Sequence, residues 1–306
     1  MSALPSASHR GLVLRVLPNL LGVALLGWFL HGLDLAGFGR ALRALRPGTV
    51  LGIAAASFVE TATQGFLFYC LCPAGQGPGR QLFLSFAAQA GNVLLPLRAG
   101  ELLRPLYLKR WRPENTYKEL LGWTLADKGL QIVAVLPFLL VGLYLFAADA
   151  QLSLALRRLG LGIGALGVVA AAGGGLWMRR RLHQSLGARA AGLPLTAWLG
   201  ATFWALCMWG ASYLVYWLAI GEPRVALALL VGVGFGSGIP SLPAGVGAYE
   251  AAFLWVGEHA HLPHDQVLAA AVVSHAVQLL TTLLVGVPVL LLWGWPRRRD
   301  AVLVGL

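Results

Sequence analysis

The chain has 306 residues, of which 58% are hydrophobic and 11% are charged, and its formal net charge is +11. A soluble domain carries about 25% charged residues, so this composition excludes an ordinary soluble protein and predicts an all-α polytopic membrane protein. The basic residues flank apolar runs and form no solvated basic face, which argues against nucleic acid as a partner and favours anionic lipid head groups. We expect a single integral-membrane domain over residues 1–306.

Apolar runs long enough to cross a bilayer recur along the chain. The first run, over about 12–30, is interpreted as an uncleaved span because no small-residue cleavage site follows it, and residues 34–46 are predicted to form an interfacial amphipathic helix. The other predicted spans cover about 49–71, 120–146, 154–177, 196–220 and 267–295.

Ionisable residues lie inside three of these predicted spans: Glu60, the neighbours Asp127 and Lys128, and His275. An ionisable side chain at membrane depth is costly, so it normally faces the interior of the helix bundle and has a partner there. Adjacent residues on a helix do not face each other, so we expect Asp127 and Lys128 to have separate partners. All four are candidates for a proton or polar relay. For Glu60 and His275 the alternative is a structural hydrogen bond to a neighbouring helix.

Two apolar segments contain glycines and prolines that interrupt a regular helix. Residues 232–250, GVGFGSGIPSLPAGVGAYE, hold six glycines and two prolines and end at Glu250. Residues 91–101, GNVLLPLRAGE, repeat the order of Leu-Pro followed by Gly and Glu. Within a helix, Gly is about 1 kcal/mol less favourable than Ala, and Pro removes a donor and clashes with the preceding turn. A non-helical backbone at membrane depth is tolerated where it is buried in protein or lines a water-filled cavity. Both segments are therefore candidates for a functional site.

The distribution of charge along the chain predicts its topology. Arginines at 179–181 and 297–299, and the basic block after the first broken segment, are expected in the cytoplasm together with both termini. Residues 258–265, which have acids and histidines but no Lys or Arg, are expected outside. The second broken segment then starts and ends outside, whereas the first enters from the cytoplasm.

This topology predicts about six full transmembrane helices plus two re-entrant broken-helix hairpins that form an inverted repeat, with pseudo-repeats over about 12–146 and 154–295. A competing topology makes residues 81–97 a full span and places the N-terminus outside. We prefer the first topology because alternating access through inverted repeats requires hairpins of opposite orientation.

Charged residues beside the two breaks are the candidates for ligand binding. Arg98, Glu101 and Arg104 are three residues apart, so on a helix they share one face. Guanidinium groups suit a lipid phosphate, and Glu101 would hold them in place or contact a head-group amine. The alternative is a juxtamembrane loop that only orients the chain. Glu250 is expected to be exposed towards the outer side, where it would titrate, bind a cationic head group, or cap a helix N-terminus.

The remaining motifs predict neither a metal nor a cofactor. His259, His261 and His264 have a spacing that places them on no common face, so no metal site is expected there. A P-loop, a G-x-S-x-G motif and an H-E-x-x-H motif are all missing from the sequence, which favours a transporter over an enzyme but leaves an intramembrane enzyme open.

The segments GNVLLPLRAGELLRPLYLKR at 91–110 and GIPSLPAGVGAYEAAFL at 238–254 resemble the lysylphosphatidylglycerol synthase/flippase-like transmembrane family. That family includes the membrane half of the multiple peptide resistance factor and stand-alone relatives. Its N-x-x-x-P…G-E motif maps onto Asn92, Pro96, Gly100 and Glu101, and its P-x-x-x-G…E motif onto Pro243, Gly247 and Glu250. Where the family has Glu-Arg followed by Asp in the third span and an Arg in the last, this chain has Asp127-Lys128 and Ser274-His275, so the resemblance does not fix the substrate.

The resemblance implies a lipid translocase of the bacterial inner membrane, which moves a phospholipid or a polyprenyl-phosphate-linked lipid between the two hairpins. Arg98 and Arg104 would hold phosphate, and Glu101, Glu250 and Glu60 would take amines or protons. The cavity would be lined by the broken backbone at Asn92, Pro96, Ser237, Pro240 and Pro243. The alternatives are a non-transporting membrane partner that presents lipid to a glycosyl- or aminoacyl-transferase, and an intramembrane lipid-modifying enzyme. The soluble aminoacyl-transfer domain of two-part family members has no counterpart in these residues, so we do not expect this chain to make an aminoacylated lipid itself.

Overall fold

A computed structural model describes residues 46–72, 77–147, 193–236 and 243–294, together with Ala36, Gly39, Arg40 and Arg43. Over these residues the chain is helical and contains no strand, as the composition predicts. The predicted spans over 12–30 and 154–177 lie outside the described residues, as does most of the predicted amphipathic helix.

The described helices lie close to the predicted segments. The first group is α3 Pro47–Leu71, α4 Pro78–Leu94, the 3-10 helix η1 Pro96–Leu102, α5 Leu103–Trp111 and α6 Tyr117–Ala147. The second group is α9 Leu195–Ile220, α10 Pro223–Gly236, the 3-10 helix η2 Pro243–Gly245, α11 Ala248–His259 and α12 His264–Trp293. Within the described part of the chain, α3, α9 and α12 are the three helices that are long and apolar enough to cross a membrane.

Local sequence signals explain several of the helix ends. Proline stands in the first turn of α3 and of α4, where its fixed φ favours a helix and its missing N–H leaves no donor without a partner. Helix α9 ends at Ile220 and is capped by Gly221, whose φ of 81° lies in the left-handed region that glycine adopts without strain.

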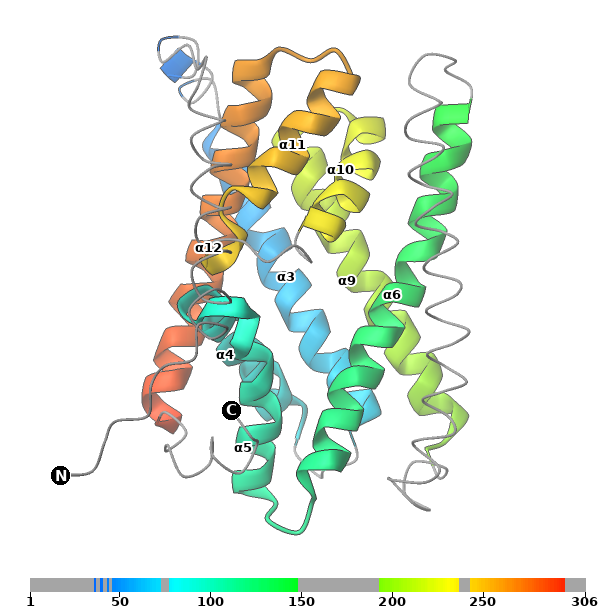
Figure 1. The fold of residues 1–306 in the computed structure, drawn as a ribbon, viewed down its shortest axis with the longest axis vertical. Coiled ribbons are helices and arrows are strands. Elements are labelled where there is room, and N and C mark those ends of the chain that lie inside the picture. Colours follow the sequence, from blue (N-terminus) through cyan, green and yellow to red (C-terminus); the bar gives the residue numbers. More distant parts are fainter. Residues whose placement is uncertain are drawn as a thin grey trace, which may run out of the picture.

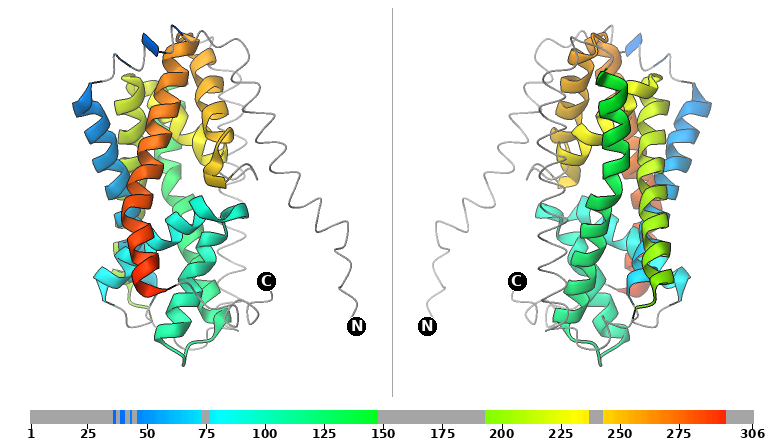
Figure 2. Two further views of the ribbon diagram at one scale, coloured as in Figure 1. Left: turned by 90° about the vertical axis from the view of Figure 1, so that its left-hand side faces the viewer. Right: turned by 90° about the vertical axis from the view of Figure 1, so that its right-hand side faces the viewer.

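The long and short helices occupy different parts of the molecule. Helices α3, α6, α9 and α12 run most of its length in Figure 1, whereas α4 and α5 lie in the lower half and α10 and α11 in the upper half. The two side views in Figure 2 show the same division. The 3-10 helices η1 and η2 contact each other, and η2 also contacts α4, so the two interrupted segments meet near mid-height.

Each half has its own hydrophobic core. One cluster packs α10 and α11 against α9 and the start of α12, with Phe253, Leu230 and Val215 fully or almost fully buried. The other packs α4 and α5 against the end of α3, with Leu84 and Leu108 at its centre. Helices α3, α9 and α12 contribute to both clusters and so join the two halves.

Close backbone contacts fix the first interrupted segment against α4 and α12. A Cβ on Gly100 of η1 would collide with the Ala88 carbonyl oxygen and the Asn92 nitrogen of α4. A Cβ on Gly286 of α12 would likewise collide with the Phe86 carbonyl oxygen of α4. Small residues at such crossings let helix backbones approach closely, and this van der Waals packing contributes to helix association in membranes.

The second broken segment is interrupted as predicted, although the interruption starts later than expected. Helix α10 continues to Gly236 and so contains three of the predicted helix-breaking glycines, Gly232, Gly234 and Gly236. Ser237 and Pro240 lie outside the described residues. Beyond them the backbone turns through positive φ values at Ala244 (67°) and at two glycines, and α11 begins at Ala248.

Candidate functional site

The tip of the first interrupted segment is organised by Asn92, near the end of α4. Its side-chain oxygen accepts the backbone N–H of Glu101 at 3.1 Å, and its Nδ2 donates to Glu101 Oε1 at 3.3 Å. Asn92 itself is held by Gln89, whose Oε1 accepts from Nδ2 at 3.1 Å. One buried amide therefore fixes both the backbone and the carboxylate of Glu101.

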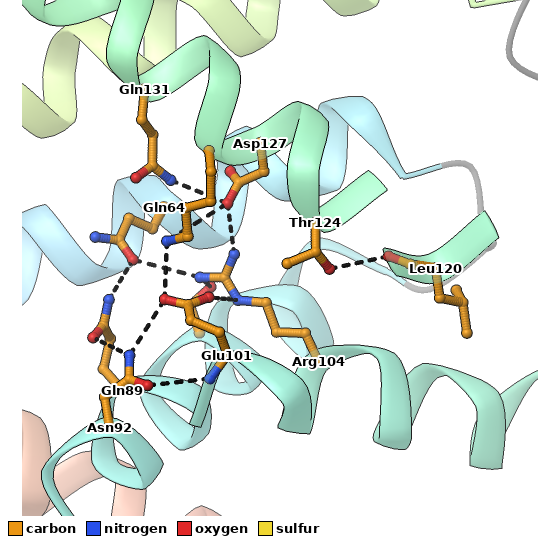
Figure 3. Close-up of polar contacts among 11 residues, drawn as sticks. Gln64, Gln89, Asn92, Glu101, Arg104, Leu120, Thr124, Asp127 and Gln131 are labelled. Atoms are coloured by element: carbon orange, nitrogen blue, oxygen red, sulfur yellow. Dashed lines mark hydrogen bonds and ion pairs between the residues drawn. The ribbon is translucent and has the colours of Figure 1, made fainter. Parts of the chain in front are cut away.

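Four charged residues meet beside this tip (Figure 3), and we call Glu101, Arg104, Asp127 and Lys128 the charge cluster. The guanidinium of Arg104 contacts Asp127 Oδ2 at 2.9 Å, and both side chains are 0% exposed. Lys128 Nζ contacts Glu101 Oε1 at 2.9 Å, and these two side chains are 34% and 20% exposed. The cluster therefore consists of a buried ion pair and a partly exposed one.

The neighbours Asp127 and Lys128 have separate partners on other elements, which confirms the expectation from their adjacency on a helix. The two ion pairs nevertheless belong to one electrostatic unit. Lys128 Nζ lies 4.0 Å from Asp127 Oδ2, and Arg104 Nε lies 3.8 Å from Glu101 Oε2. Two positive and two negative charges give the cluster a net charge of zero.

Uncharged polar side chains complete the network, and the sequence interpretation did not place them in the site. Arg104 donates to Gln64 and Ser85, each at 3.4 Å, and Gln89 donates to Gln64 at 2.7 Å. Gln131 donates to Asp127 Oδ2 at 3.0 Å. The available signal was the presence of glutamines within otherwise apolar helices, where an amide needs a partner from another helix.

Some polar atoms of the charge cluster make no hydrogen bond to any described residue. Within the part of the chain that the structure describes, Glu101 Oε2, Arg104 Nε and Asp127 Oδ1 are buried without a hydrogen-bond partner. Most buried polar atoms in native proteins are paired, so atoms left unpaired in a charged network indicate a functional site or a strained state.

A second polar site lies at the other interrupted segment. Glu250 Oε1 lies 2.7 Å from His275 Nδ1, and His275 Nε2 lies 3.1 Å from the Ala244 carbonyl oxygen. A carbonyl oxygen only accepts, so Nε2 carries a proton and donates it. The hydrogen bond between Nδ1 and Glu250 Oε1 then contains one further proton, which lies between the ring and the carboxyl group.

The expectation that Glu250 is exposed is wrong, because the residue is only 7% exposed. Its Oε2 accepts the backbone N–H of Gly247 at 2.7 Å, so the carboxyl group turns inward to cap the N-terminus of α11. Of the roles that the sequence left open, helix capping is therefore present, and the contact with His275 adds a second role.

The side chain of Tyr249 packs against the ring of His275. The two rings stack with centroids 4.2 Å apart, and the Tyr249 hydroxyl bonds Ser274 at 2.9 Å and accepts from Gln278 at 2.7 Å. The hydroxyl thus connects α11 to α12 through two hydrogen bonds.

We expect Tyr249→Phe to lower the free energy of unfolding by about 1–3 kcal/mol, because Ser274 and Gln278 lose a shared partner while ring stacking remains. Thermal unfolding of the purified protein in detergent measures the change. Tyr69→Phe is the control, since Tyr69 is 42% exposed. Equal melting temperatures for the two variants would contradict a structural role of the hydroxyl.

The other predicted site residues lie outside these two networks. Glu60 on α3 lies beside Ser212 of α9, an arrangement that matches the structural alternative given for it. The backbones of Pro96 and Arg98 belong to η1 and that of Pro243 to η2, but their side chains are outside the described part of the structure.

His259 ends α11, His261 lies in the turn after it, and His264 begins α12. His259 Nδ1 bonds the Trp255 carbonyl oxygen at 2.7 Å. Among the described residues, no three His, Cys, Asp or Glu side chains form a group that would hold a metal ion.

Comparison with known proteins identifies the family. A family model described as the lysylphosphatidylglycerol synthase TM region matches residues 15–286, which include both interrupted segments and both polar sites. A comparison with curated proteins finds no match. The matched region covers most of the chain, and its described part is helical with long apolar helices. The protein is therefore a membrane protein that belongs to the lysylphosphatidylglycerol synthase transmembrane-region family.

Proposed function

We propose that the protein is a lipid translocase that moves a phospholipid or a polyprenyl-phosphate-linked lipid across the bacterial inner membrane. The observation that carries this proposal is the partly exposed ion pair of Glu101 and Lys128, held at a break in the backbone near mid-height. At membrane depth an exposed ion pair requires water or a polar ligand beside it. A lipid head group in transit supplies such a ligand.

The short helices support an arrangement of re-entrant hairpins. At 1.5 Å per residue, the 17 residues of α4 extend about 25 Å, less than the roughly 30 Å of a hydrocarbon core. Helices α4 and α5 occupy one half of the molecule, and α10 and α11 occupy the other (Figure 1). We propose that they are two hairpins of opposite orientation within an inverted repeat, with both termini in the cytoplasm.

The polar contacts have the same relation in both proposed repeats. In each, the acid at the hairpin tip contacts a side-chain nitrogen on the following long helix. Glu101 contacts Lys128, which is 27 residues later (128 − 101). Glu250 contacts His275, which is 25 residues later (275 − 250). Interrupted helices at corresponding positions of two repeats are a feature of transporters whose site lies between the repeats.

The burial of Arg104 modifies the role that we propose for it. Its guanidinium is wholly buried and paired with Asp127, so we assign it to neutralising Asp127 and positioning the tip. Lys128, with its 34% exposure, is then the cation of the cluster that contacts the lipid phosphate. The broken backbone from Asn92 to Gly100 and from Pro243 to Gly247 would line the path of the head group.

Transport by purified protein in liposomes tests this function. We expect Glu101→Gln and Glu250→Gln each to slow lipid movement about tenfold or more, because each loses a charge-assisted hydrogen bond of about 1.5–3 kcal/mol. The panel contains fluorescent anionic, zwitterionic and isoprenoid-phosphate lipids.

Glu258→Gln and Glu114→Gln serve as controls, since both residues are exposed acids near the two tested elements. Folded wild-type protein that moves none of these lipids would contradict the translocase. It would favour the alternative in which the protein presents lipid to a transferase.

A further inference from the structure

The exposed side of the charge cluster holds a primary ammonium group, that of Lys128, against a carboxylate. Lys128 Nζ lies 2.9 Å from Glu101 Oε1, and Asn92 Nδ2 donates to the same oxygen at 3.3 Å. Lys128 is also the most exposed member of the cluster, and its side chain has rotational freedom along four carbons. Its ammonium can therefore leave Glu101 while the rest of the cluster stays in place.

The buried part of the cluster is suited to remain fixed during such an exchange. Arg104 and Asp127 are fully buried and neutralise each other, and Gln64, Ser85 and Gln131 bond to them from three other positions. Asn92 holds the backbone of Glu101 independently of Lys128. The carboxylate of Glu101 is thus positioned without the lysine.

The charge balance restricts the ligand. The cluster has a net charge of zero, so a ligand without net charge leaves the site neutral. An anionic or cationic head group would add an uncompensated charge in a region of low dielectric constant, which is strongly unfavourable. The site therefore favours a zwitterion with one positive and one negative group.

We infer that the charge cluster binds a zwitterionic phospholipid head group that carries a primary ammonium and a phosphate, which is the chemistry of phosphoethanolamine. The head-group ammonium replaces Lys128 Nζ on Glu101 Oε1, and the released Lys128 pairs with the phosphate. This inference rests on the proposed lipid-handling function and names its substrate class.

The hydrogen-bonding pattern distinguishes a primary amine from a quaternary one. A primary ammonium donates N–H groups to Glu101 Oε1, as Lys128 does, whereas a trimethylated ammonium has no N–H to donate. Phosphocholine therefore matches the charge balance of the site but not its hydrogen bonds. Phosphoglycerol matches neither.

Binding to the full-length protein in detergent provides the test, with native mass spectrometry as the readout. The probes are short-chain lipids with identical acyl chains and the head groups phosphoethanolamine, its mono- and dimethyl derivatives, phosphocholine and phosphoglycerol. We expect the affinity to fall about tenfold or more in total from phosphoethanolamine to phosphocholine, with the largest step where the last N–H is lost. This series needs only wild-type protein.

Two variants of the exposed pair change the net charge in opposite directions. Glu101→Gln leaves the cluster at +1, so we expect the preference to shift to phosphoglycerol. Lys128→Met leaves it at −1, so a cationic alkylamine amphiphile should bind more tightly than the phosphoethanolamine lipid. Lys118→Met is the matched control, because Lys118 is an exposed lysine on the same helix, and it should keep the wild-type ranking.

Equal affinity of the wild type for phosphoethanolamine and phosphocholine would overturn the inference, as would an unchanged ranking in Glu101→Gln. Transport of the same lipids is measured separately in liposomes. A protein that keeps the binding preference but moves no lipid contradicts the translocase and leaves the head-group assignment standing. A protein that transports all the lipids equally and binds them equally contradicts the assignment alone.

Discussion

Arg104→Met should lower the free energy of unfolding by about 3–5 kcal/mol, because it leaves the carboxylate of Asp127 buried without its cation. Asp127 is fully buried, and its Oδ1 already lacks a hydrogen-bond partner among the described residues. Lys128 Nζ lies 4.0 Å away and is already bonded to Glu101, so it compensates only weakly. Unfolding of the purified protein in mixed detergent micelles measures the loss.

The double variant Arg104→Met/Asp127→Leu should recover most of this stability. Replacing both members of a buried ion pair with apolar residues is often neutral or stabilising, whereas removal of one member is not. Glu114→Gln is the control, because Glu114 belongs to an exposed pair with Arg112, and such pairs contribute about 1 kcal/mol or less. If the double variant is as unstable as Arg104→Met, the uncompensated charge of Asp127 is not the cause of the lost stability.

Gly100→Ala should destabilise the protein by about 3 kcal/mol and also abolish lipid movement. The added Cβ collides with backbone atoms of Ala88 and Asn92, which cannot give way by rotating a side chain. The tip of η1 must therefore move away from α4, and the two bonds between Asn92 and Glu101 are lost with it. Thermal unfolding and liposome transport measure the two effects.

Gly210→Ala is the matched control, since it lies within α9 and a Cβ there meets no atom within 4 Å. Alanine is about 1 kcal/mol more favourable than glycine inside a helix, so this variant should be at least as stable as the wild type. A Gly100→Ala protein with wild-type stability and transport would show that η1 is not seated on α4.

The elements of the fold were largely predictable, because apolar length and helix-breaking residues are local properties of the sequence. The predicted span at 49–71 corresponds to α3, and the break at Pro96 to the start of η1. The course of the second break was not predictable in detail. Ala244 adopts a φ of 67° that propensity does not favour for alanine, and this turn directs Glu250 inward.

The composition of the site was predictable in part. Charge and position singled out Glu101, Arg104 and the pair at 127–128, since ionisable residues within apolar segments need partners. Which partner each one has depends on how the helices are rotated about their axes, and the sequence does not encode this locally. Gln64 and Gln89 were missed for the same reason, because their hydrogen bond joins residues of two helices that lie 25 positions apart in the sequence.

Helix α12 contacts both interrupted segments along its length. Gly286 packs on α4 beside the first, and His275, 11 residues earlier (286 − 275), bonds Glu250 and Ala244 in the second. A displacement of α12 along or about its axis therefore alters both contacts together. A ligand that displaces α12 at one segment would change the contacts at the other, and thermodynamic linkage requires any such influence to be mutual. Helix α12 is thus the element that connects the two interrupted segments.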